Sequence, residues 1–374
     1  MRVFFTGGGT GGHLYPALAI ARALVAVRPE VRPHFIGALR GIEREILPTT
    51  EFPHTLLALH PLYRSTPWRN WRTVTGLTSG WRQISALAST DRPKLVVATG
   101  GYASGAALSW SLLSRVPYVL QEQNSFPGKT VRAFSRWARE IYLGFPEAVA
   151  LLPPNARAHA VDTGNPIEPP SAIRGDRASL RRIWGLDESV RIVILAFGGS
   201  QGSAALNTLV DGWIARGLPR GIGVIWGTGR DHFNKHRARA SERVAIRPYL
   251  APIADAYAAS DFAIARAGAM TTAELLAWGI PMLLIPLPTA AADHQTANAR
   301  ALAAAGAARW IAQSDATVDS LDTVVREMTS DDQTLSSLSN AARMRGRPES
   351  SARIAAHISA LLDRATASDR ARSA

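Results

Sequence analysis

The chain has 374 residues, which at roughly 100–200 residues per domain predicts two domains. Hydrophobic residues make up 47% of the sequence and charged residues 19%, a globular profile that excludes a disordered chain. Cysteine is absent, so thiolate catalysis, cysteine-ligated zinc and a disulfide-stapled fold are excluded.

The net charge is +13, and only three of the 42 basic residues, Lys94, Lys129 and Lys235, are lysines. Such a balance suits a polyanionic partner: a nucleic acid, an anionic membrane surface or a phosphorylated substrate. A compositional bias toward arginine would give the same excess, so the total charge does not choose among these partners.

Short apolar runs alternate with helical patterns along the chain. The first apolar run, at residues 3–6, is followed by a predicted helix over residues 16–27. The alternation predicts an α/β fold with parallel sheets and crossover helices. Strands are predicted at residues 3–6, 34–37, 95–99, 118–121, 192–197, 223–226, 262–265 and 282–285. No apolar run reaches the ~18 residues of a membrane span, and the N-terminal run is too short for a signal peptide, so we expect a cytoplasmic protein.

The two halves open alike, each with a strand, a glycine-rich turn and a helix, as doubly wound domains do. The turns are GGGTGG at residues 7–12 and GGSQG at residues 198–202. A proline-rich stretch at 164–170 predicts the linker, giving domains over 1–164 and 165–349. Residues 350–362 form an amphipathic helix that we expect to pack back on the first domain.

Glycine turns after strands offer backbone N–H groups to phosphate or other electron-rich groups. Gly7, Gly9 and Gly12 match the dinucleotide fingerprint, but the acidic residue that would hold a ribose after the second strand is missing. One alternative function is therefore a nicotinamide or flavin oxidoreductase. Another alternative is that the glycines only form tight turns and bind no ligand.

A second set of residues follows the strand at 262–265. Gly268 permits a sharp turn, Thr271 and Thr272 can cap the next helix, and Glu274 lies one turn into it. A carboxylate there can accept two hydrogen bonds from a ribose diol while the helix start faces a diphosphate. Glu274 can equally be a capping residue.

Seven motifs in order resemble the MurG family of peptidoglycan glucosaminyltransferases, over residues 2 to about 310. They are GGGTGGH at 7–13 with Pro16, GGYASG at 100–105, EQN at 122–124, GNP at 164–166, GGSQG at 198–202, GAMTTAE at 268–274 and DHQTAN at 293–298. The chain departs from the family pattern at Glu168, where an arginine is usual and Arg174 is one possible substitute, and at Gln121, where a histidine is usual.

The resemblance implies a GT-B fold, two Rossmann-like doubly wound domains around a deep cleft. It implies inverting transfer of N-acetylglucosamine from UDP-GlcNAc to the muramyl 4-hydroxyl of lipid I, undecaprenyl-diphosphate-MurNAc-pentapeptide, forming lipid II for peptidoglycan synthesis, cell shape and division. The N-terminal domain would take the acceptor and the C-terminal domain the donor. No cofactor is implied, and the enzyme would be peripheral at the cytoplasmic face of the cell membrane.

The resemblance also implies a set of substrate-binding residues. Glu274 would bind the ribose hydroxyls, the Leu250 backbone the uracil and Gln295 the GlcNAc. The donor side comprises Ser200, Gln201, Leu250, Ala269, Met270, Thr271, Thr272, Ala273, Glu274 and Gln295; the first domain adds Thr10, Gly11, Gly12 and Asn124 around the donor sugar.

An inverting transfer needs a base for the acceptor hydroxyl and a group that stabilises the departing UDP. His13 is the leading base candidate, although it can instead order the glycine loop, and Glu122 is the second. N–H groups near residues 270–272 would meet the diphosphate. Paired carboxylates at metal-ligand spacing are absent from the sequence, so no metal is expected.

Tryptophan, arginine and aliphatic residues mix over residues 64–82, notably Trp71, Arg72, Leu77, Trp81 and Arg82. The mixture suits docking on an anionic membrane surface. It can also stack on nucleic acid bases, or form a helix packed with its tryptophans inward. The lipid tail of the implied acceptor favours the membrane. A nucleic-acid-binding protein, the non-enzyme alternative, would need neither two glycine turns nor Glu274, so we expect no nucleic acid partner.

Overall fold

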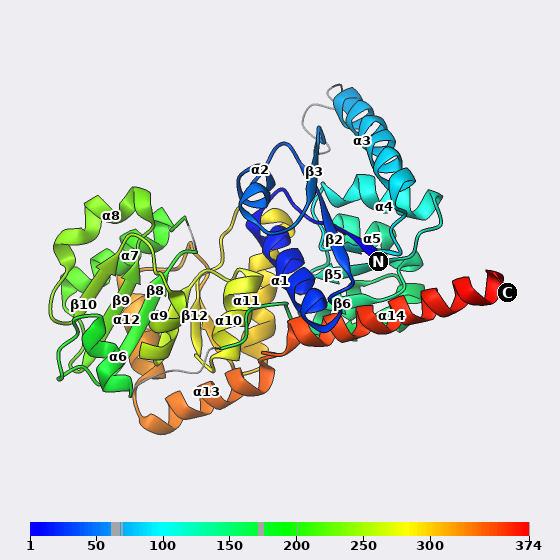
Figure 1. Cartoon of the computed structure of the whole chain (residues 1–374). Helices are drawn as coiled ribbons and strands as arrows, with labels where there is room; N and C mark the ends of the chain where they lie inside the picture. Colours follow the sequence, from blue (N-terminus) through cyan, green and yellow to red (C-terminus); the bar gives the residue numbers. More distant parts are fainter. Residues whose placement is uncertain (61–67, 69, 171–175, 200, 374) are drawn as a thin grey trace. The chain divides into compact units, whose positions relative to one another are not determined.

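The structure, a computed structural model, describes residues 1–60, 68, 70–170, 176–199 and 201–373, with side chains as far as residue 367. It divides into two compact units (Figure 1). Unit 1 comprises Met1–Glu168 and Glu349–Ala374, and unit 2 comprises Pro169–Pro348. Among the described residues, no helix has both the length and the apolar character needed to cross a membrane.

Unit 1 contains a seven-stranded parallel sheet in the order β3-β2-β1-β4-β5-β6-β7. The order reverses between β1 and β4, which is the switch point of a doubly wound sheet. The strands are β1 Arg2–Thr6, β2 Arg32–Ala38, β3 His54–Leu57, β4 Leu95–Ala98, β5 Tyr118–Glu122, β6 Ile141–Leu143 and β7 Ala160–Asp162.

Helices cover both faces of this sheet. α1 packs with Val3 and Phe5 of β1 on one face, and α3 and α4 pack with Phe4 on the other. The helices are α1 Gly11–Val27, α2 Glu43–Ile46, α3 Asn70–Thr90, α4 Ser104–Leu113, α5 Lys129–Phe134 and α14 Ser350–Ser373, with short 3-10 turns that include η1 Leu47–Thr49, η3 Ser135–Trp137, η4 Pro146–Leu151 and η5 Pro154–His159.

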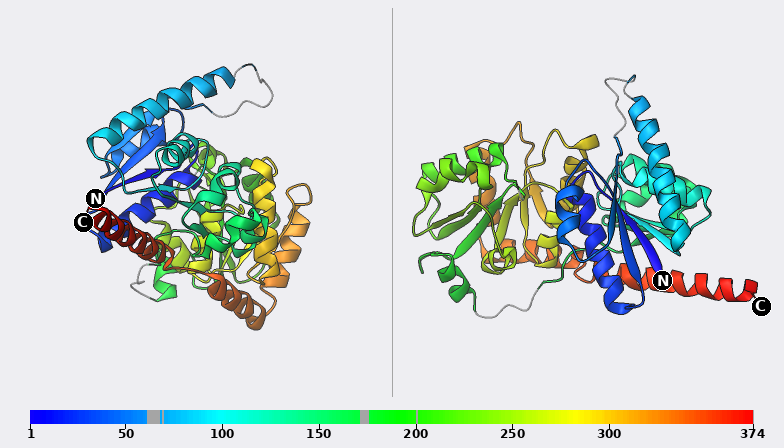
Figure 2. Two further views of the ribbon diagram at one scale, coloured as in Figure 1. Left: turned by 90° about the vertical axis from the view of Figure 1, so that its right-hand side faces the viewer. Right: turned by 45° about the horizontal axis from the view of Figure 1, so that its top comes forward.

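The last helix, α14, belongs to the core of unit 1. Ile354, Ile358 and Leu362 are buried with the β1 and α1 side chains. Figure 2 shows the ribbon of α14, which packs along α1. At its start the Ser350 hydroxyl donates to the Thr163 carbonyl over 2.6 Å. The helix continues to Ser373 rather than ending at residue 362 as expected.

Unit 2 repeats the arrangement with a six-stranded parallel sheet in the order β10-β9-β8-β11-β12-β13. Its strands are β8 Ile192–Phe197, β9 Ile222–Gly227, β10 Val244–Arg247, β11 Phe262–Ala265, β12 Met282–Leu284 and β13 Ala308–Trp310. Its helices are α6 Arg177–Ile183, α7 Ala204–Arg216, α8 Arg230–His236, α9 Ile253–Ala259, α10 Ala269–Ala277, α11 His294–Ala304, α12 Val318–Met328 and α13 Asp332–Arg345, with 3-10 turns η6 Arg237–Arg239 and η7 Ala291–Asp293.

The predicted α/β class, with two doubly wound parallel sheets, is confirmed, while the cleft between the units stays a prediction. The first helix begins at Gly11, not at residue 16, because Thr10 already has the extended backbone of an N-cap, and Pro16 lies inside the helix. The sequence analysis missed β3, β6, β7, β10 and β13, which have only three or four residues each.

Candidate active site

The first site lies at the switch point of unit 1. β1 and β4 are parallel neighbours, so the turns that follow them meet at one sheet edge. The Thr99 hydroxyl, after β4, donates to the His13 carbonyl over 2.7 Å. Gly101 has a φ of +78°, and a Cβ there would overlap the Gly8 carbonyl, so this close approach requires glycine.

The glycine loop of unit 1 is held by a carboxylate that the sequence analysis did not single out. Glu43, at the start of α2, is fully buried, and its Oε1 accepts the Gly9 N–H at 2.9 Å and the Ala38 N–H at 3.3 Å. Its Oε2 is buried without a partner among the described residues. A Cβ on Gly8 would overlap this carboxylate, which explains the glycine.

Glu43 bears directly on the dinucleotide alternative. The acid missing at the end of β2 is present five residues later, but it turns inward and occupies the Gly9 N–H. A phosphate placed on that N–H would meet a like charge in a buried setting, where repulsion is weakly screened. The loop is therefore poorly suited to a dinucleotide phosphate.

His13 is half-buried in the first turn of α1, and its ring is fixed by two acceptors. Nδ1 lies 2.9 Å from the Thr99 carbonyl and 2.9 Å from Gln123 Oε1. Since both partners accept, Nδ1 carries the hydrogen, and in the neutral ring Nε2 then has the lone pair. Nε2 is the nitrogen that can take a proton.

Behind His13 lies a buried network of neutral amides. Gln123 donates through Nε2 to the Thr99 carbonyl at 2.7 Å and to Gln121 Oε1. Gln121 in turn donates to Asn165 Oδ1 at 3.1 Å, and Asn165 donates to the Gln123 carbonyl at 2.9 Å. The amide groups of the network do not titrate, so none of them can take a proton in place of His13.

Glu122, the second base candidate, is 2% exposed. Its Oε1 accepts the backbone N–H of Asn124 at 3.0 Å and its Oε2 accepts that of Gly128 at 2.8 Å. Burial raises the pKa of this carboxyl, and the N–H donors oppose the rise. Both oxygens are thus engaged in closing the loop that carries Asn124.

The remaining predicted residues of unit 1 form the start of α1. Thr10 is its N-cap, and the Thr10 carbonyl accepts the N–H of His13 at 3.2 Å. Among the described residues no side chain caps this helix start, and Thr10 and Gly12 are exposed. The loop thus presents Thr10, Gly11 and Gly12 at the surface beside His13.

The equivalent switch point of unit 2 is organised by an arginine. Arg266, after β11, is 7% exposed and donates to Ser203 of the glycine turn, at 2.7 Å from Nη2, and to the Ile285 carbonyl at 2.9 Å. Nη2 also reaches Gln313 Oε1 at 2.7 Å. Among the described residues Arg266 forms no ion pair, and burial lowers its pKa. A positive charge therefore lies beneath this site.

Helix α10 starts next to Arg266 without a side-chain cap from any described residue. Thr272 donates to the carbonyls of Gly268 and Ala269, both at 3.1 Å, so it is turned into its own helix. Ala269 and Thr272 are buried, whereas Met270, Thr271 and Ala273 are partly exposed at the helix start. A helix start beside a buried cation suits a diphosphate.

Glu274 is half-buried, and the Tyr257 hydroxyl donates to its Oε2 over 2.6 Å. Tyr257 is 3% exposed; burial raises its pKa well above the ordinary value, and the neighbouring Glu274 charge adds to the rise. Tyr257 therefore stays protonated and orients Glu274. A hydrogen bond of this kind would hold the carboxylate in position to bind a diol.

The other donor-side residues lie on separate loops. Gln295, at the start of α11, accepts the Leu287 N–H at 2.9 Å through Oε1, which leaves its amide nitrogen as a donor. Leu250 is buried against Gly227, and Gln201 is exposed in the glycine turn. Ser200 lies outside the described residues, and so does Arg174.

Helix α3 places the predicted membrane residues outward. Its packed face consists of small residues, among them Thr73, Gly76 and Gly80. A Cβ on Gly76 would lie 2.7 Å from the Ala58 carbonyl, so the helix approaches closely there. Trp71 is 61% exposed and Trp81 37%. The alternative of a helix with its tryptophans inward is wrong.

The exposed large apolar residues of α3 share one face. Trp71, Val74, Leu77 and Trp81 follow one another at three or four residues, the spacing of a helical stripe. Arg72 and Arg82 are exposed beside it, and the Arg72 guanidinium lies 5.4 Å from the Trp71 ring centroid.

No cluster of three or more histidine, aspartate or glutamate side chains that could hold a metal ion occurs in the part of the chain that the structure describes.

Comparisons with known proteins agree with this geometry. Residues 3–143 match the glycosyltransferase family 28 N-terminal domain, and residues 193–357 match the family 28 C-terminal domain. A relative from Moorella thermoacetica, named UDP-N-acetylglucosamine–N-acetylmuramyl-(pentapeptide) pyrophosphoryl-undecaprenol N-acetylglucosamine transferase, is 38% identical, with 93% of this chain and 95% of the relative covered. The chain belongs to this transferase family.

Further comparisons support the same family. A relative of the same name from Salinibacter ruber is 36% identical, with 97% of each chain covered. The crystal structure of Acinetobacter baumannii MurG has a TM-score of 0.76 and 26% identity, covering 96% of this chain and 99% of that one. The predicted family and the GT-B class are confirmed. The oxidoreductase and nucleic-acid alternatives gain no support.

The two departures from the family pattern have different surroundings. Gln121 is fully buried within the amide network described above, whereas Glu168 is exposed. The Glu168 charge acts on Arg22 of α1, whose pKa is raised mainly by its hydrogen bond to Glu51. In this transferase, position 168 therefore faces a cation already paired with another carboxylate.

We predict that Glu122→Gln loses one of the two hydrogen bonds to the N–H groups of Asn124 and Gly128. The new side-chain NH2 group would face one of these N–H groups, and two donors cannot pair. The expected loss of unfolding free energy is about 1–3 kcal/mol, measured by urea unfolding. Glu45→Gln, at an exposed position, is the control and should leave stability unchanged. A stable Glu122→Gln protein that has lost only turnover would instead identify Glu122 as the base.

Proposed function

We propose that the protein transfers N-acetylglucosamine from UDP-GlcNAc to the muramyl 4-hydroxyl of lipid I, with inversion at the anomeric carbon, and so forms lipid II. The observation that carries this proposal is the match of relatives with that activity in their name, at 36–38% identity across both units. The site geometry supports it, since each step of the transfer has residues suited to it.

We assign the base to His13. Its Nε2 takes the proton of the acceptor hydroxyl as the oxygen bonds to the anomeric carbon of the donor. The bond from that carbon to the β-phosphate oxygen breaks, and its electron pair leaves with UDP. A single displacement of this kind inverts the anomeric carbon. Glu122, with both oxygens on backbone N–H groups, holds the Asn124 loop.

The departing diphosphate gains charge, and we assign its stabilisation to unit 2. The start of α10, at Met270 and Thr271, offers backbone N–H groups and the positive end of the helix dipole. Arg266 adds a buried positive charge behind the same loops. Glu274, oriented by Tyr257, binds the ribose hydroxyls, and the Leu250 backbone meets the uracil.

The GlcNAc moiety has hydroxyl groups and an amide but no charge. Thr10, Gly11, Gly12 and Asn124 offer neutral hydrogen-bonding groups in unit 1, and Gln295 offers its amide nitrogen in unit 2. These contacts select the sugar, whereas the charged contacts of unit 2 select the nucleotide diphosphate.

The transfer is tested directly by incubating the full chain with UDP-GlcNAc and a lipid I analogue. We expect stoichiometric UDP and a β-linked disaccharide product, detected by mass spectrometry and proton NMR. A calorimetric titration should show binding of UDP and UDP-GlcNAc. Binding of NAD instead, or UDP-GlcNAc hydrolysis without acceptor glycosylation, would reject the proposal.

The base assignment is tested with His13→Asn, whose amide nitrogen can replace Nδ1 toward Thr99 and Gln123 but offers nothing at Nε2. We expect turnover to fall about 100-fold or more, with UDP-GlcNAc affinity nearly unchanged. The acidic limb of the pH–rate profile, where a general base is protonated and inactive, should be lost. His13→Ala, which also loses the anchor, is the comparison. If His13→Asn keeps near-normal turnover, the histidine only orders the loop.

We further propose that the enzyme is peripheral at the cytoplasmic face of the cell membrane and that α3 contacts the anionic surface. The exposed stripe of Trp71, Leu77 and Trp81, flanked by Arg72 and Arg82, has the composition of an interfacial helix. An acceptor with a polyprenyl tail has to be met at such a surface.

We predict that the Trp71→Ala, Trp81→Ala double variant binds anionic liposomes at least about tenfold more weakly than the wild type. The reason is that it lacks the apolar area that the two exposed rings would bury in the membrane on binding. Co-sedimentation measures the change. Tyr249→Ala in unit 2, an exposed ring also beside an arginine, Arg230, is the control and should bind normally. Unchanged binding of the double variant would show that α3 is not the anchor.

A further inference from the structure

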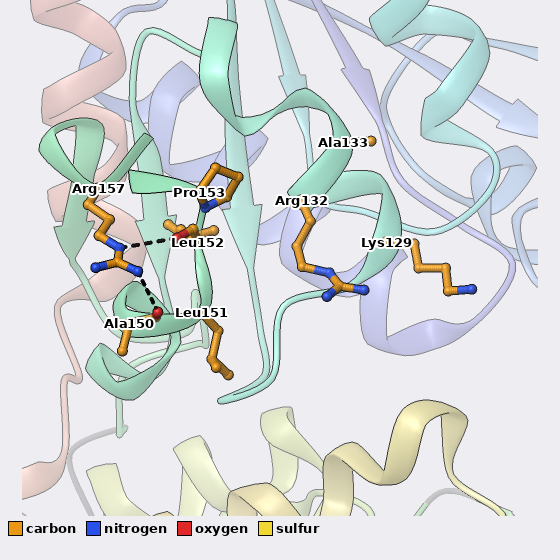
Figure 3. A pocket seen from close by; sticks show the side chains of 8 residues that line it. All are labelled: Lys129, Arg132, Ala133, Ala150, Leu151, Leu152, Pro153 and Arg157. Carbon is orange, nitrogen blue, oxygen red and sulfur yellow. Dashed lines mark hydrogen bonds between the residues drawn. The ribbon is translucent and has the colours of Figure 1, made fainter. Parts of the chain in front are cut away.

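Unit 1 contains a surface pocket of about 630 Å³ that none of the site residues above lines (Figure 3). Three cations and five apolar residues form its wall. They are Lys129, Arg132 and Ala133 of α5, Ala150 and Leu151 of η4, and Leu152, Pro153 and Arg157 beyond it. No acidic side chain belongs to this wall.

The cations of the pocket are held without a counter-charge. Arg157 donates from Nε to the Leu152 carbonyl at 3.1 Å and from Nη2 to the Ala150 carbonyl at 2.9 Å, which fixes the guanidinium (Figure 3). The Arg132 guanidinium lies 5.4 Å from the Phe126 ring centroid. None of the three cations forms an ion pair with any described carboxylate. Oriented, uncompensated cations suit a phosphate group.

The rest of the wall is hydrocarbon. Leu151 is 47% exposed, an unusual position for a leucine between basic side chains, and Leu152 beneath it is 2% exposed. Figure 3 shows Lys129, Arg132 and Leu151 extending toward the same side of the pocket. A ligand that satisfies both halves has a phosphate group joined to an apolar chain.

The pocket is built on the same support as the candidate active site. Glu122 Oε2 accepts the N–H of Gly128, the residue that precedes Lys129 and caps α5, while its Oε1 holds Asn124. One buried carboxylate thus fixes both Asn124 and the helix that carries Lys129 and Arg132. A ligand in the pocket would sit on a frame shared with the sugar site.

We propose that this pocket binds the prenyl diphosphate part of the acceptor. The diphosphate lies among Lys129, Arg132 and Arg157, and the first prenyl units lie on Leu151 and Leu152. The inference rests on the proposed function, and the printed name of the relatives includes a pyrophosphoryl-undecaprenol group. A single-chain diphosphate, with more charge than a phospholipid phosphodiester, matches three cations around one short apolar strip.

The pocket is tested by titrating the full chain with farnesyl diphosphate below its micellar concentration, and with inorganic pyrophosphate and farnesol as its two halves. We expect farnesyl diphosphate to bind at least tenfold more tightly than either half. Arg132→Gln should weaken farnesyl diphosphate binding about tenfold and raise KM for a lipid I analogue, with UDP-GlcNAc affinity unchanged. Leu151→Gln should weaken farnesyl diphosphate but not pyrophosphate.

Arg139→Gln, at an exposed position beyond α5, is the matched control and should bind farnesyl diphosphate normally. Normal farnesyl diphosphate binding by both Arg132→Gln and Lys129→Gln would overturn the proposal. Variants that lose binding to anionic phospholipid vesicles but keep normal farnesyl diphosphate binding would overturn it too. Failure of the wild type to bind UDP-GlcNAc would reject the proposed function instead, because that titration does not involve this pocket.

Discussion

The hydrogen bond from the Gly9 N–H to the buried Glu43 carboxylate shows the constraint on which both units depend. At a switch point the loops that follow two neighbouring strands diverge. The backbone N–H groups exposed there need hydrogen-bond acceptors. Unit 1 supplies such an acceptor from Glu43. Glu122, at the end of β5, does the same for the loop after the next strand. Unit 2 instead places Arg266 among its own carbonyls and leaves the start of α10 uncapped by any described side chain. The same topology is therefore supported by a buried carboxyl group in unit 1 and by a buried arginine in unit 2.

This difference divides the chemistry. Glu43 occupies the Gly9 N–H, so the glycine loop of unit 1 is suited to hydroxyl and amide groups rather than to a phosphate. Arg266 and the α10 start suit the charge that develops on a departing diphosphate. The amide network behind His13 contributes no second titrating group, so proton uptake falls on one imidazole.

The sequence was sufficient for features with a local cause. Glycine turns after apolar runs located both switch points, and the order of motifs identified the family. Features that depend on tertiary packing were missed. Glu43 is separated from β2 by a turn, so nothing local shows that it folds back onto Gly9. Arg266 precedes the motif at 268–274, and nothing local shows that it bonds to Ser203 and to the Ile285 carbonyl. The outward tryptophans of α3 follow from glycines that pack against residues 58–59, a contact invisible in composition.

The position of α14 has a consequence for how the chain is made. The buried side chains of α14, among them Ile354, Ile358 and Leu362, complete a hydrophobic core whose other buried side chains lie between residues 3 and 142. Unit 2 is continuous from Pro169 to Pro348 and can fold as soon as it leaves the ribosome, since domains generally fold as units during synthesis. Unit 1 has to wait for α14, and the part of its core that α14 covers, beside α1, is exposed until then. The unit whose translation begins first is thus the last to finish folding. A nascent chain shortened before α14 would expose apolar surface to chaperones.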